Sequence, residues 1–135
     1  MPVASFDHVA LPTVDPEALI VFYGALGFRV PDPDEWKASG APLFAIHFGT
    51  QKINVHAPAL WQNDDFTLRG PTAKPGCGDL CFVWEGGREA LHQTLEAAGA
   101  EIIAGPVELD GGGGRGVSVY TRDPDANLLE FIIYD

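Results

Sequence analysis

Cysteine is scarce in this chain, with only Cys77 and Cys81 among its 135 residues. Two cysteines cannot build a disulfide framework, and their C-x3-C spacing in CGDLC matches no zinc-knuckle pattern. An extended strand would also hold the two thiols too far apart to pair easily. We therefore expect a protein of the reducing cytoplasm, in which Cys81 is most simply interpreted as a small buried hydrophobic residue.

Basic residues are few as well, since 8 lysines and arginines stand against 19 acidic residues, a formal net charge of −11. That charge repels phosphate backbones and anionic membranes, which argues against nucleic-acid and membrane binding. An anionic substrate would need a locally positive site, such as a metal or a well-placed arginine. No apolar run approaches the roughly 18 residues of a membrane-spanning helix. The N-terminus lacks a basic segment followed by an apolar one, so the sequence predicts no signal peptide.

The chain does contain an internal repeat. The segment DHVALPTVDPEALIVFYGALGFRV, from Asp7, shows the same order of features as GDLCFVWEGGREALHQTLEAAGAEII, from Gly78. His8 falls on Asp79, and the glycine that ends the first helical pattern falls on the glycine that ends the second. Each segment is typical of a short strand, a turn, a helix stopped by glycine and another strand.

Each half continues with two strands around a turn rich in turn-forming residues, at 49–52 in the first half and 123–127 in the second. The sequence therefore predicts an α+β fold of two tandem βαβββ modules related by pseudo-twofold symmetry. We expect a single domain over 1–135, with modules at about 4–60 and 77–135 and a polar linker at about 61–76.

Four metal-capable residues occupy matching places in the two modules. His8 and Asp79 lie in the first strands, and aligning the closing strands sets His56 against Glu130. Taken singly, each has an ordinary structural explanation, as a core histidine, a strand-end residue or a capping carboxylate. Glu130 resists that explanation most, because an unpaired buried carboxylate in NLLEFIIY would cost several kcal/mol. The matching positions predict a curved sheet around a metal cleft whose donors suit Zn, Ni, Mn, Co or Fe(II).

The alternation of side chains along strands adds neighbours to this cleft. If residues 49–52 form a symmetric turn, His47 pairs with Asn54, and both share a strand face with His56. By the same period, Cys81 shares the face of Asp79. His47 is then either a substrate-facing group or a hydrogen-bonded wall residue.

The glycine-rich segment DGGGGRG, residues 110–116, resembles a phosphate-binding loop only superficially. It lacks the Gly-Lys-Ser/Thr ending and opens no helix, so a flexible connection between two strands is the better interpretation. Arg115 within it, and Trp61 in the linker, could reach a substrate from mobile segments, with exposed surface as the alternative for each. The predicted pocket combines a polar centre with apolar walls, which suits a small organic ligand.

Four segments carry a family resemblance: FDHVAL, FYGALGF, GDLCF and above all RDPDANLLEF. They resemble the vicinal oxygen chelate superfamily, which includes glyoxalase I, bleomycin- and fosfomycin-resistance proteins and extradiol dioxygenases. RDPDANLLEF is similar to the family's Asp-Pro-Asp-Gly-Asn hairpin followed by its metal-binding Glu. Within the superfamily, INVHAP, GDLC and RDPDANLLE are most similar to the glyoxalase-domain-containing 5 type, also known as virulence-related proteins.

The resemblance implies a role for each of the four residues. His8 matches the first-strand ligand and Glu130 the last-strand ligand. His56 stands where glyoxalase I usually has Glu, and Asp79 where glyoxalase I has Gln or His and the dioxygenases have His. These two departures argue against glyoxalase I activity itself and against the usual dioxygenase placement. Two histidines and Glu130 would still supply a facial triad, with Asp79 as base or fourth ligand.

Two functions fit this interpretation of the four residues, and the resemblance implies a homodimer for both. In the first, a metal-dependent enzyme holds two substrate oxygens on the cation, which stabilises a developing enolate or oxyanion as a Lewis acid. Glu130 or Asp79 would shuttle a proton in lyase or isomerase chemistry, or the protein would be a dioxygenase if the metal is Fe(II). In the second, a metal-independent protein sequesters a small molecule, as bleomycin-resistance members do. The ligand set favours the enzyme.

Overall fold

Seven strands form two sheets in the computed structural model, which describes residues 1–134. The first sheet, in the order β1-β3-β2, contains β1 (His8–Pro12), β2 (Leu43–Phe48) and β3 (Gln51–His56). The second, in the order β4-β7-β6-β5, contains β4 (Asp79–Val83), β5 (Ala104–Gly111), β6 (Gly114–Arg122) and β7 (Leu128–Tyr134). The helices are α1 (Pro16–Ala25), α2 (Pro33–Ser39), α3 (Pro58–Trp61) and α4 (Arg88–Ala97).

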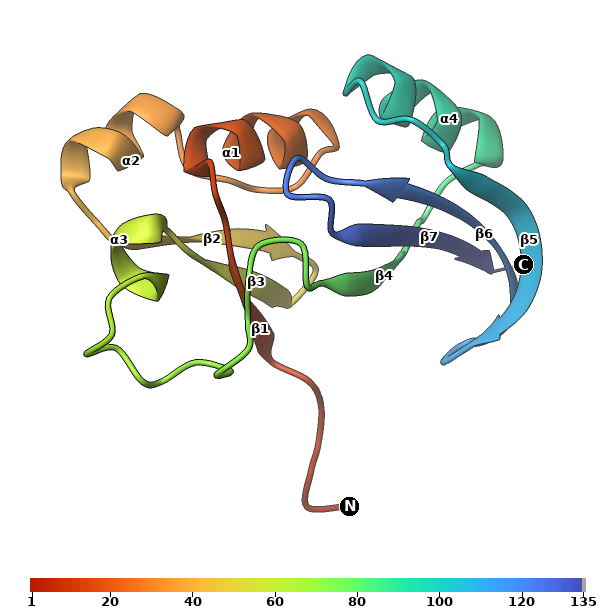
Figure 1. Ribbon diagram of the computed structural model, residues 1–135. Coiled ribbons are helices and arrows are strands. Elements are labelled where there is room, and N and C mark those ends of the chain that lie inside the picture. The colour runs from red at the N-terminus through yellow and green to blue at the C-terminus, as the bar shows by residue number, and fades with distance from the viewer. Residues whose placement is uncertain (135) are drawn as a thin grey trace.

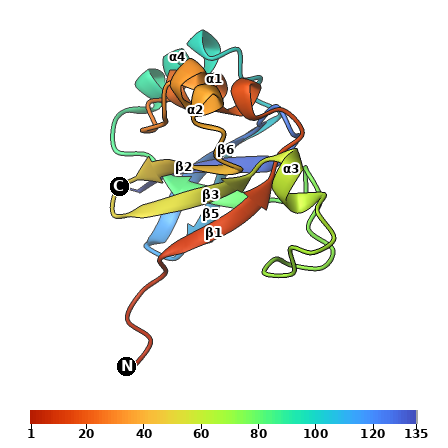
Figure 2. The same ribbon diagram turned by 90° about the vertical axis from the view of Figure 1, so that its left-hand side faces the viewer.

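The repeat is visible in how the strands pair. In each half the first strand runs parallel to the last, β1 beside β3 and β4 beside β7. The helices α1, α2 and α4 all lie over the same side of the two sheets (Figures 1 and 2). Buried side chains from both halves, including Ile20, Ile53 and Leu129, form one hydrophobic cluster beneath them. The predicted α+β fold of two modules is confirmed.

The first module differs from the predicted βαβββ pattern. After α1 the chain makes only an isolated antiparallel bridge between Arg29 and His47, and α2 follows instead of a strand. The reason is local, because Pro31 and Pro33 have no N–H to donate to a strand ladder. Asp32 caps α2 by accepting a hydrogen bond from the Glu35 N–H at 3.0 Å.

The hairpin between β2 and β3 has a shorter turn than the sequence suggested. Only Gly49 and Thr50 form it, and Gly49 has a positive φ of 52°, which suits a tight hairpin turn. His47 therefore pairs with Lys52, so the expected pairing of His47 with Asn54 is wrong. Because the shift is two residues, the alternation of faces is unchanged, and His47 and Asn54 still share a face.

The helix ends follow the local rules that predicted them. Asp15 caps α1, accepting from the Ala18 N–H at 3.2 Å, and Pro16 is its first residue. Gly27 and Gly99 follow directly after the C-caps of α1 and α4. None of these helices is long and apolar enough to cross a membrane, within the residues described.

The turn between β6 and β7, residues 123–127 (the DPDAN turn), is built around a buried carboxylate. Asp123 accepts hydrogen bonds from the Tyr23 hydroxyl and the Asn127 side-chain amide, each at 2.8 Å. It also accepts from the backbone N–H groups of Asp125 and Asn127, at 2.9 and 3.0 Å. Burial raises the pKa of Asp123, and the hydrogen bonds from Asn127 and Tyr23 act against that rise. Because Tyr23 belongs to α1, the turn ties the two modules together.

The same turn also contacts the chain just before β4. Asn127 accepts a hydrogen bond from the Gly78 N–H at 2.7 Å, and Asp125 accepts one from the Val14 N–H at 2.9 Å. A Cβ atom at Gly78 would lie 2.8 Å from the Asn127 side-chain oxygen, so this approach requires glycine. The turn therefore sets where β4 begins relative to β7.

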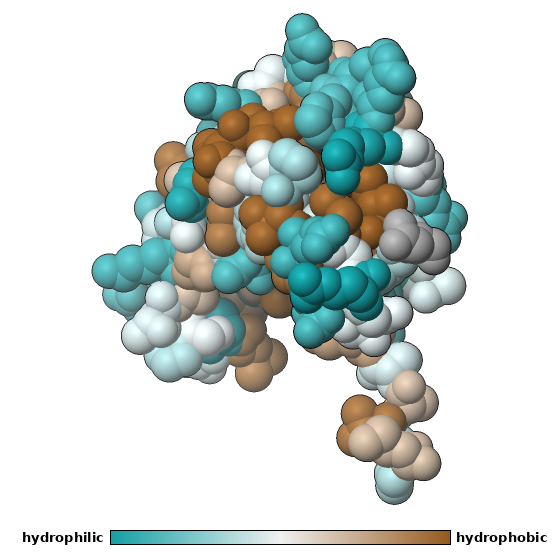
Figure 3. Space-filling model, turned by 90° about the vertical axis from the view of Figure 1, so that its right-hand side faces the viewer, coloured by the Kyte–Doolittle hydropathy of each residue, from teal (hydrophilic) through white to brown (hydrophobic). Residues whose placement is uncertain are grey.

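The surface near β5 is partly apolar. Ile103 and Val107 are 46% and 43% exposed. On the side of the molecule that carries the C-terminus, hydrophobic patches adjoin hydrophilic ones (Figure 3).

Replacing Tyr23 with Phe removes one donor from the buried Asp123 carboxylate. We expect the free energy of unfolding at pH 7 to fall by about 1.5–3 kcal/mol, as for other hydrogen bonds to charged groups. The Tyr23 bond lowers the pKa of Asp123, so its contribution is present above that pKa and disappears as the pH falls through it. Urea denaturation of both proteins at several pH values measures this difference.

Tyr134→Phe is the matched control, because the Tyr134 hydroxyl accepts only an exposed hydrogen bond, from the Gly113 N–H. Its loss should cost less than half as much and should show no such pH dependence. Equal losses for the two variants would mean that the Asp123 network does not stabilise the contact between modules.

Candidate functional site

Each sheet presents a second face, directed away from α1, α2 and α4, which we call its open face. Strand pairing decides which side chains share it. The open face of the first sheet carries His8, His47, Lys52, Asn54 and His56. The open face of the second sheet carries Asp79, Cys81, Ser118, Tyr120 and Glu130. The predicted sharing of faces by Asp79 and Cys81 is confirmed.

Glu130 is half-buried at the centre of the second open face. The fully buried Ser118 donates a hydrogen bond of 2.6 Å from its hydroxyl to Oε2 of Glu130. In the pairing register, Glu130 lies opposite Cys81 on one side and Tyr120 on the other. The thiol of Cys81 and the hydroxyl of Tyr120 also lie within hydrogen-bonding reach of the Glu130 carboxylate, so a ligand at Oε1 would share Glu130 with them.

The neighbours of Glu130 respond to its negative charge. The pKa of Cys81 is raised to about 12, first by desolvation of the thiol, then by Glu130 and, less strongly, by Asp79. Burial followed by the Glu130 charge likewise raises the pKa of Tyr120. No lysine or arginine among the described residues forms an ion pair with either carboxylate. The residue Cys81 as a whole is exposed, so its interpretation as a buried hydrophobic residue is wrong.

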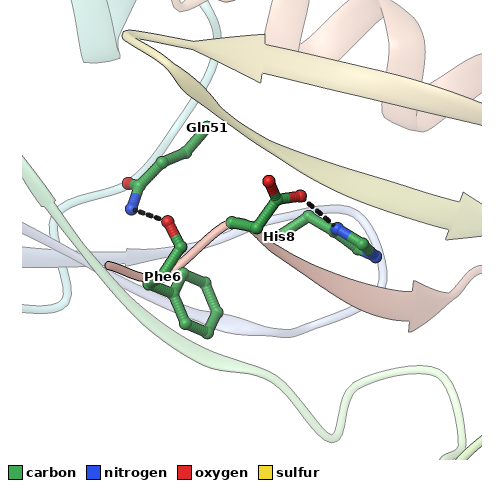
Figure 4. A network of polar contacts seen from close by, with 4 residues as sticks. Phe6, His8 and Gln51 are labelled. Atoms are coloured by element: carbon green, nitrogen blue, oxygen red, sulfur yellow. Dashed lines mark hydrogen bonds and ion pairs between the residues drawn. The ribbon is translucent and has the colours of Figure 1, made fainter. Parts of the chain in front are cut away.

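His8 lies at the start of β1 with its side chain 43% exposed. Its Nδ1 lies 2.6 Å from a carboxylate oxygen of Asp7, and Figure 4 shows this contact. An N–H at Nδ1 leaves Nε2 with a free lone pair, the arrangement that orients a metal-binding histidine. Gln51 holds Phe6, the residue before Asp7, by donating a hydrogen bond to its carbonyl at 3.0 Å (Figure 4).

The pairing register revises which residue is equivalent to Glu130. Asp79 lies opposite the residue two positions before Glu130. His8, its counterpart, lies opposite the residue two positions before Asn54. By strand pairing, Asn54 therefore takes the place of Glu130 in the first module, and the alignment of His56 with Glu130 is corrected. The side-chain oxygen of Asn54 is buried without a hydrogen-bond partner in residues 1–134.

His56 sits at the far end of β3, opposite Pro12. That is four residues beyond the position opposite His8, or about 13 Å along the strand. The buried ring lies edge-on to Phe66 of the linker, with centroids 5.4 Å apart. Burial lowers its pKa, as does the charge of Arg69. A ligand role for His56 remains a prediction, and the register makes Asn54 the better candidate at that position.

The four predicted ligands are divided between the two sheets. Among residues 1–134, no group of three His, Cys, Asp or Glu side chains is arranged to hold a metal ion. The open face of the first sheet offers imidazole and amide donors, and that of the second offers two carboxylates. Neither open face by itself therefore carries all four predicted ligands.

Two other residues predicted for the pocket are engaged elsewhere. Trp61 donates a hydrogen bond from its indole N–H to the Thr13 carbonyl at 2.9 Å. Arg115 lies beside the turn of the β5–β6 hairpin, 3.4 Å from an Asp110 carboxylate oxygen and 3.8 Å from one of Glu108. Most of the glycine-rich segment belongs to these two strands, and only residues 112 and 113 form the connection. Substrate contact by Trp61 and Arg115 stays a prediction.

A groove of about 610 Å³ runs between the end of α1, the β2–β3 turn and β4. His47 and Cys81, both predicted to line a pocket, border it. Its other polar residues include Arg29, which no sequence pattern pointed to, because the groove depends on contacts between the two modules. The one sequence feature that could have drawn attention to Arg29 is the small number of basic residues in the chain.

Comparison with known proteins agrees with this architecture. A sequence profile of the Glyoxalase/Bleomycin resistance protein/Dioxygenase superfamily matches residues 5–131. Glyoxalase domain-containing protein RDO1 of Mycosarcoma maydis is 34% identical over 132 residues, which cover 98% of this chain and 69% of that protein. Virulence protein STM3117 of Salmonella typhimurium is 35% identical over 129 residues, covering 95% of this chain and 83% of that protein.

Solved structures show the same similarity. The crystal structure of STM3117 matches with a TM-score of 0.83 at 33% identity and covers 100% of both chains. The integron cassette protein VCH_CASS1 of V. cholerae matches with a TM-score of 0.83 at 32% identity, covering 100% of this chain and 98% of that one. The fold, the extent of the sequence match and these relatives show that the chain belongs to the glyoxalase/bleomycin resistance/dioxygenase superfamily.

Proposed function

We propose that the chain is a single-domain, divalent-metal-dependent enzyme that acts on a small, oxygen-rich organic substrate. The reaction class is that of a lyase or isomerase, or of a dioxygenase if the metal is Fe(II). One observation carries the proposal: Asp79 and the half-buried Glu130 share an open face without a cation of the described chain to neutralise them. A carboxylate pair of this kind is stabilised by a bound cation.

The donors fit a borderline divalent cation. His8 would bind through Nε2 while Asp7 orients the ring, and Glu130 would bind through the oxygen that Ser118 leaves free. Asp79 adds a carboxylate, and the unpartnered oxygen of Asn54 suits the remaining place better than the distant His56. Nitrogen and oxygen donors of this kind suit Zn, Ni, Mn, Co or Fe(II). When bound, the metal would supply Lewis-acid stabilisation of a developing oxyanion.

The protein's own residues would manage protons in this site. Asp79, the more exposed of the two carboxylates, would act as a general base or a ligand, and Glu130 as a ligand or proton shuttle. Ser118 restricts Glu130 to one orientation through its 2.6 Å hydrogen bond. The raised pKa keeps the Cys81 thiol protonated at neutral pH, so Cys81 would form a wall of the site.

We further propose that two chains complete the site as a homodimer. Each chain carries two donors on each open face, and no three gather in residues 1–134. The first open face, with its histidines and Lys52, is complementary in charge to the second, with Asp79 and Glu130. A twofold dimer that apposes unlike faces would form two equivalent sites.

A metal-independent sequestering protein is the second candidate. Its support is the groove of about 610 Å³ between the modules, which offers space for an organic molecule apart from the carboxylates. For either function we propose a cytoplasmic location, because Cys77 and Cys81 are both free. The acidic charge also disfavours nucleic acid as a partner.

Protein purified without a histidine tag should contain about one divalent ion per chain, as expected for a twofold dimer with two sites. Elemental analysis and a metal titration measure this. Glu130→Gln and His8→Ala should each lose the ion, because each removes a donor. Glu108→Gln, an exposed carboxylate on β5 that pairs with Arg115, is the control and should bind metal like the parent. Parent-like binding by His8→Ala would reject the metal site.

Mixing variants tests whether the site forms between chains. If His8 of one chain meets Glu130 of its partner, co-refolding equal amounts of His8→Ala and Glu130→Gln makes half of the dimers mixed. Each mixed dimer then has one complete site, which restores about a quarter of the parental metal capacity. If both donors come from the same chain, every site lacks one of them and the mixture recovers nothing.

Cysteine alkylation reports on the charge around Glu130. At pH 8, iodoacetamide should modify Cys81 at least about ten times more slowly than exposed Cys77, because the thiolate is the reactive form. Glu130→Gln should accelerate the Cys81 reaction, since removing that charge lowers the thiol pKa. Mass spectrometry of Cys77→Ser and Cys81→Ser variants separates the two rates. An unchanged Cys81 rate in Glu130→Gln would contradict the charge cluster.

A further inference from the structure

The groove between the modules has an aromatic wall. Phe28, Phe48 and Phe82 pack edge to face, with ring centroids 5.0 to 5.6 Å apart. Val83 and Trp84, at the end of β4, line the groove as well, and Val83 is 60% exposed. A volume of about 610 Å³ falls within the range of small-molecule sites. The groove is therefore large enough and apolar enough for an organic ring.

Two basic side chains come together in the same groove. Arg29 and His47 face each other across the isolated antiparallel bridge, with backbone hydrogen bonds of 3.1 and 2.9 Å. Opposed residues in an antiparallel pair project to the same face, so both side chains enter the groove from one side. The bridge thus gives the pair a rigid backbone support.

Neither basic residue is neutralised by the chain. The guanidinium of Arg29 donates one hydrogen bond, to the Gly49 carbonyl at 3.3 Å, and the His47 ring has no hydrogen-bond partner in residues 1–134. Glu85 also lines the groove, yet no ion pair joins it to Arg29 or His47. In a chain with 19 acidic residues and 8 basic ones, an arginine left without a carboxylate is available to an anion from outside.

We propose that this groove is a binding site for a flat, apolar small molecule that carries a carboxylate. Arg29 binds the carboxylate, with His47 as a second donor, and the ring lies against Phe48 and Trp84. The site is separate from the metal donors and does not depend on the proposed metal function. Cys81 is the residue at which the groove adjoins the open face of the second sheet, since it lines the groove and lies opposite Glu130 in the strand register.

The test uses 2-naphthoate and its neutral analogue 2-naphthamide, with binding measured by calorimetry in the presence of a chelator. The parent should bind naphthoate saturably and naphthamide at least about tenfold more weakly, because the charge-assisted hydrogen bond is missing. Arg29→Gln should weaken naphthoate binding about tenfold and leave naphthamide unchanged. Arg29→Lys should restore part of the affinity. The control Arg88→Gln removes a basic residue outside the groove and should bind like the parent.

Several results would overturn the proposal. It fails if millimolar naphthoate gives no saturable binding, or if Arg29→Gln binds it as well as the parent. Glu130→Gln should keep the parental affinity for naphthoate, and loss of binding there would show that the groove is no independent site. This comparison also separates the two proposals, because a chain without metal must still bind naphthoate.

A second copy of the chain is the competing occupant of the groove, and Thr50→Asp distinguishes it, because Thr50 lies in the β2–β3 turn and on neither open face. A carboxylate at this exposed position should repel naphthoate and weaken its binding. Analytical ultracentrifugation should give the same mass for this variant and the parent. If Thr50→Asp lowers the mass, the groove is an interface between chains and the proposal is wrong. Thr67→Asp, at an exposed threonine outside the groove, controls for the added charge.

Discussion

The hydrogen bonds around buried Asp123 hold the two modules in one arrangement. Tyr23 reaches this carboxylate from α1, and Asn127 connects it to Gly78 at the entry to β4. The turn that carries Asp123 also begins β7, so the same contacts set the register between β4 and β7. That register brings Glu130 onto the face of the acidic residue at the start of β4. The relative positions of Asp79 and Glu130 therefore depend on a network that contains neither residue.

The two faces of each sheet differ in what they contain: one is buried and apolar, and the other is open and carries polar groups. Helices bury the inner face, where apolar side chains supply most of the stability. The open faces are free of that requirement and carry polar groups, among them the Glu130 carboxylate and the Asn54 side-chain oxygen, which has no hydrogen-bond partner in residues 1–134. A single chain separates these donors, because its two sheets stand side by side (Figure 1). In the proposed homodimer, a second chain would bring unlike open faces together.

Local features were predictable and long-range ones were not. The cap at Asp15 could be predicted because it depends only on adjacent residues. The prediction that His47 and Asn54 share a face stayed correct despite a two-residue error in register, because side chains alternate with a period of two. The repeat predicts a strand after α1 in the first module, but Pro31 and Pro33 prevent that strand from forming. The equivalence of Asn54, and not His56, with Glu130 follows only from the pairing register, which a sequence with little identity between its halves does not define.

Charge is distributed in this molecule in a way that its net value conceals. Asp79 and Glu130 lie together without a cation, while Arg29 and His47 lie together without an anion, within the part of the chain described. Each pair attracts a ligand of the opposite charge. Cys81 adjoins both. A carboxylate-bearing molecule in the groove would thus direct its remaining functional groups toward the acidic face, where a cation would bind oxygen.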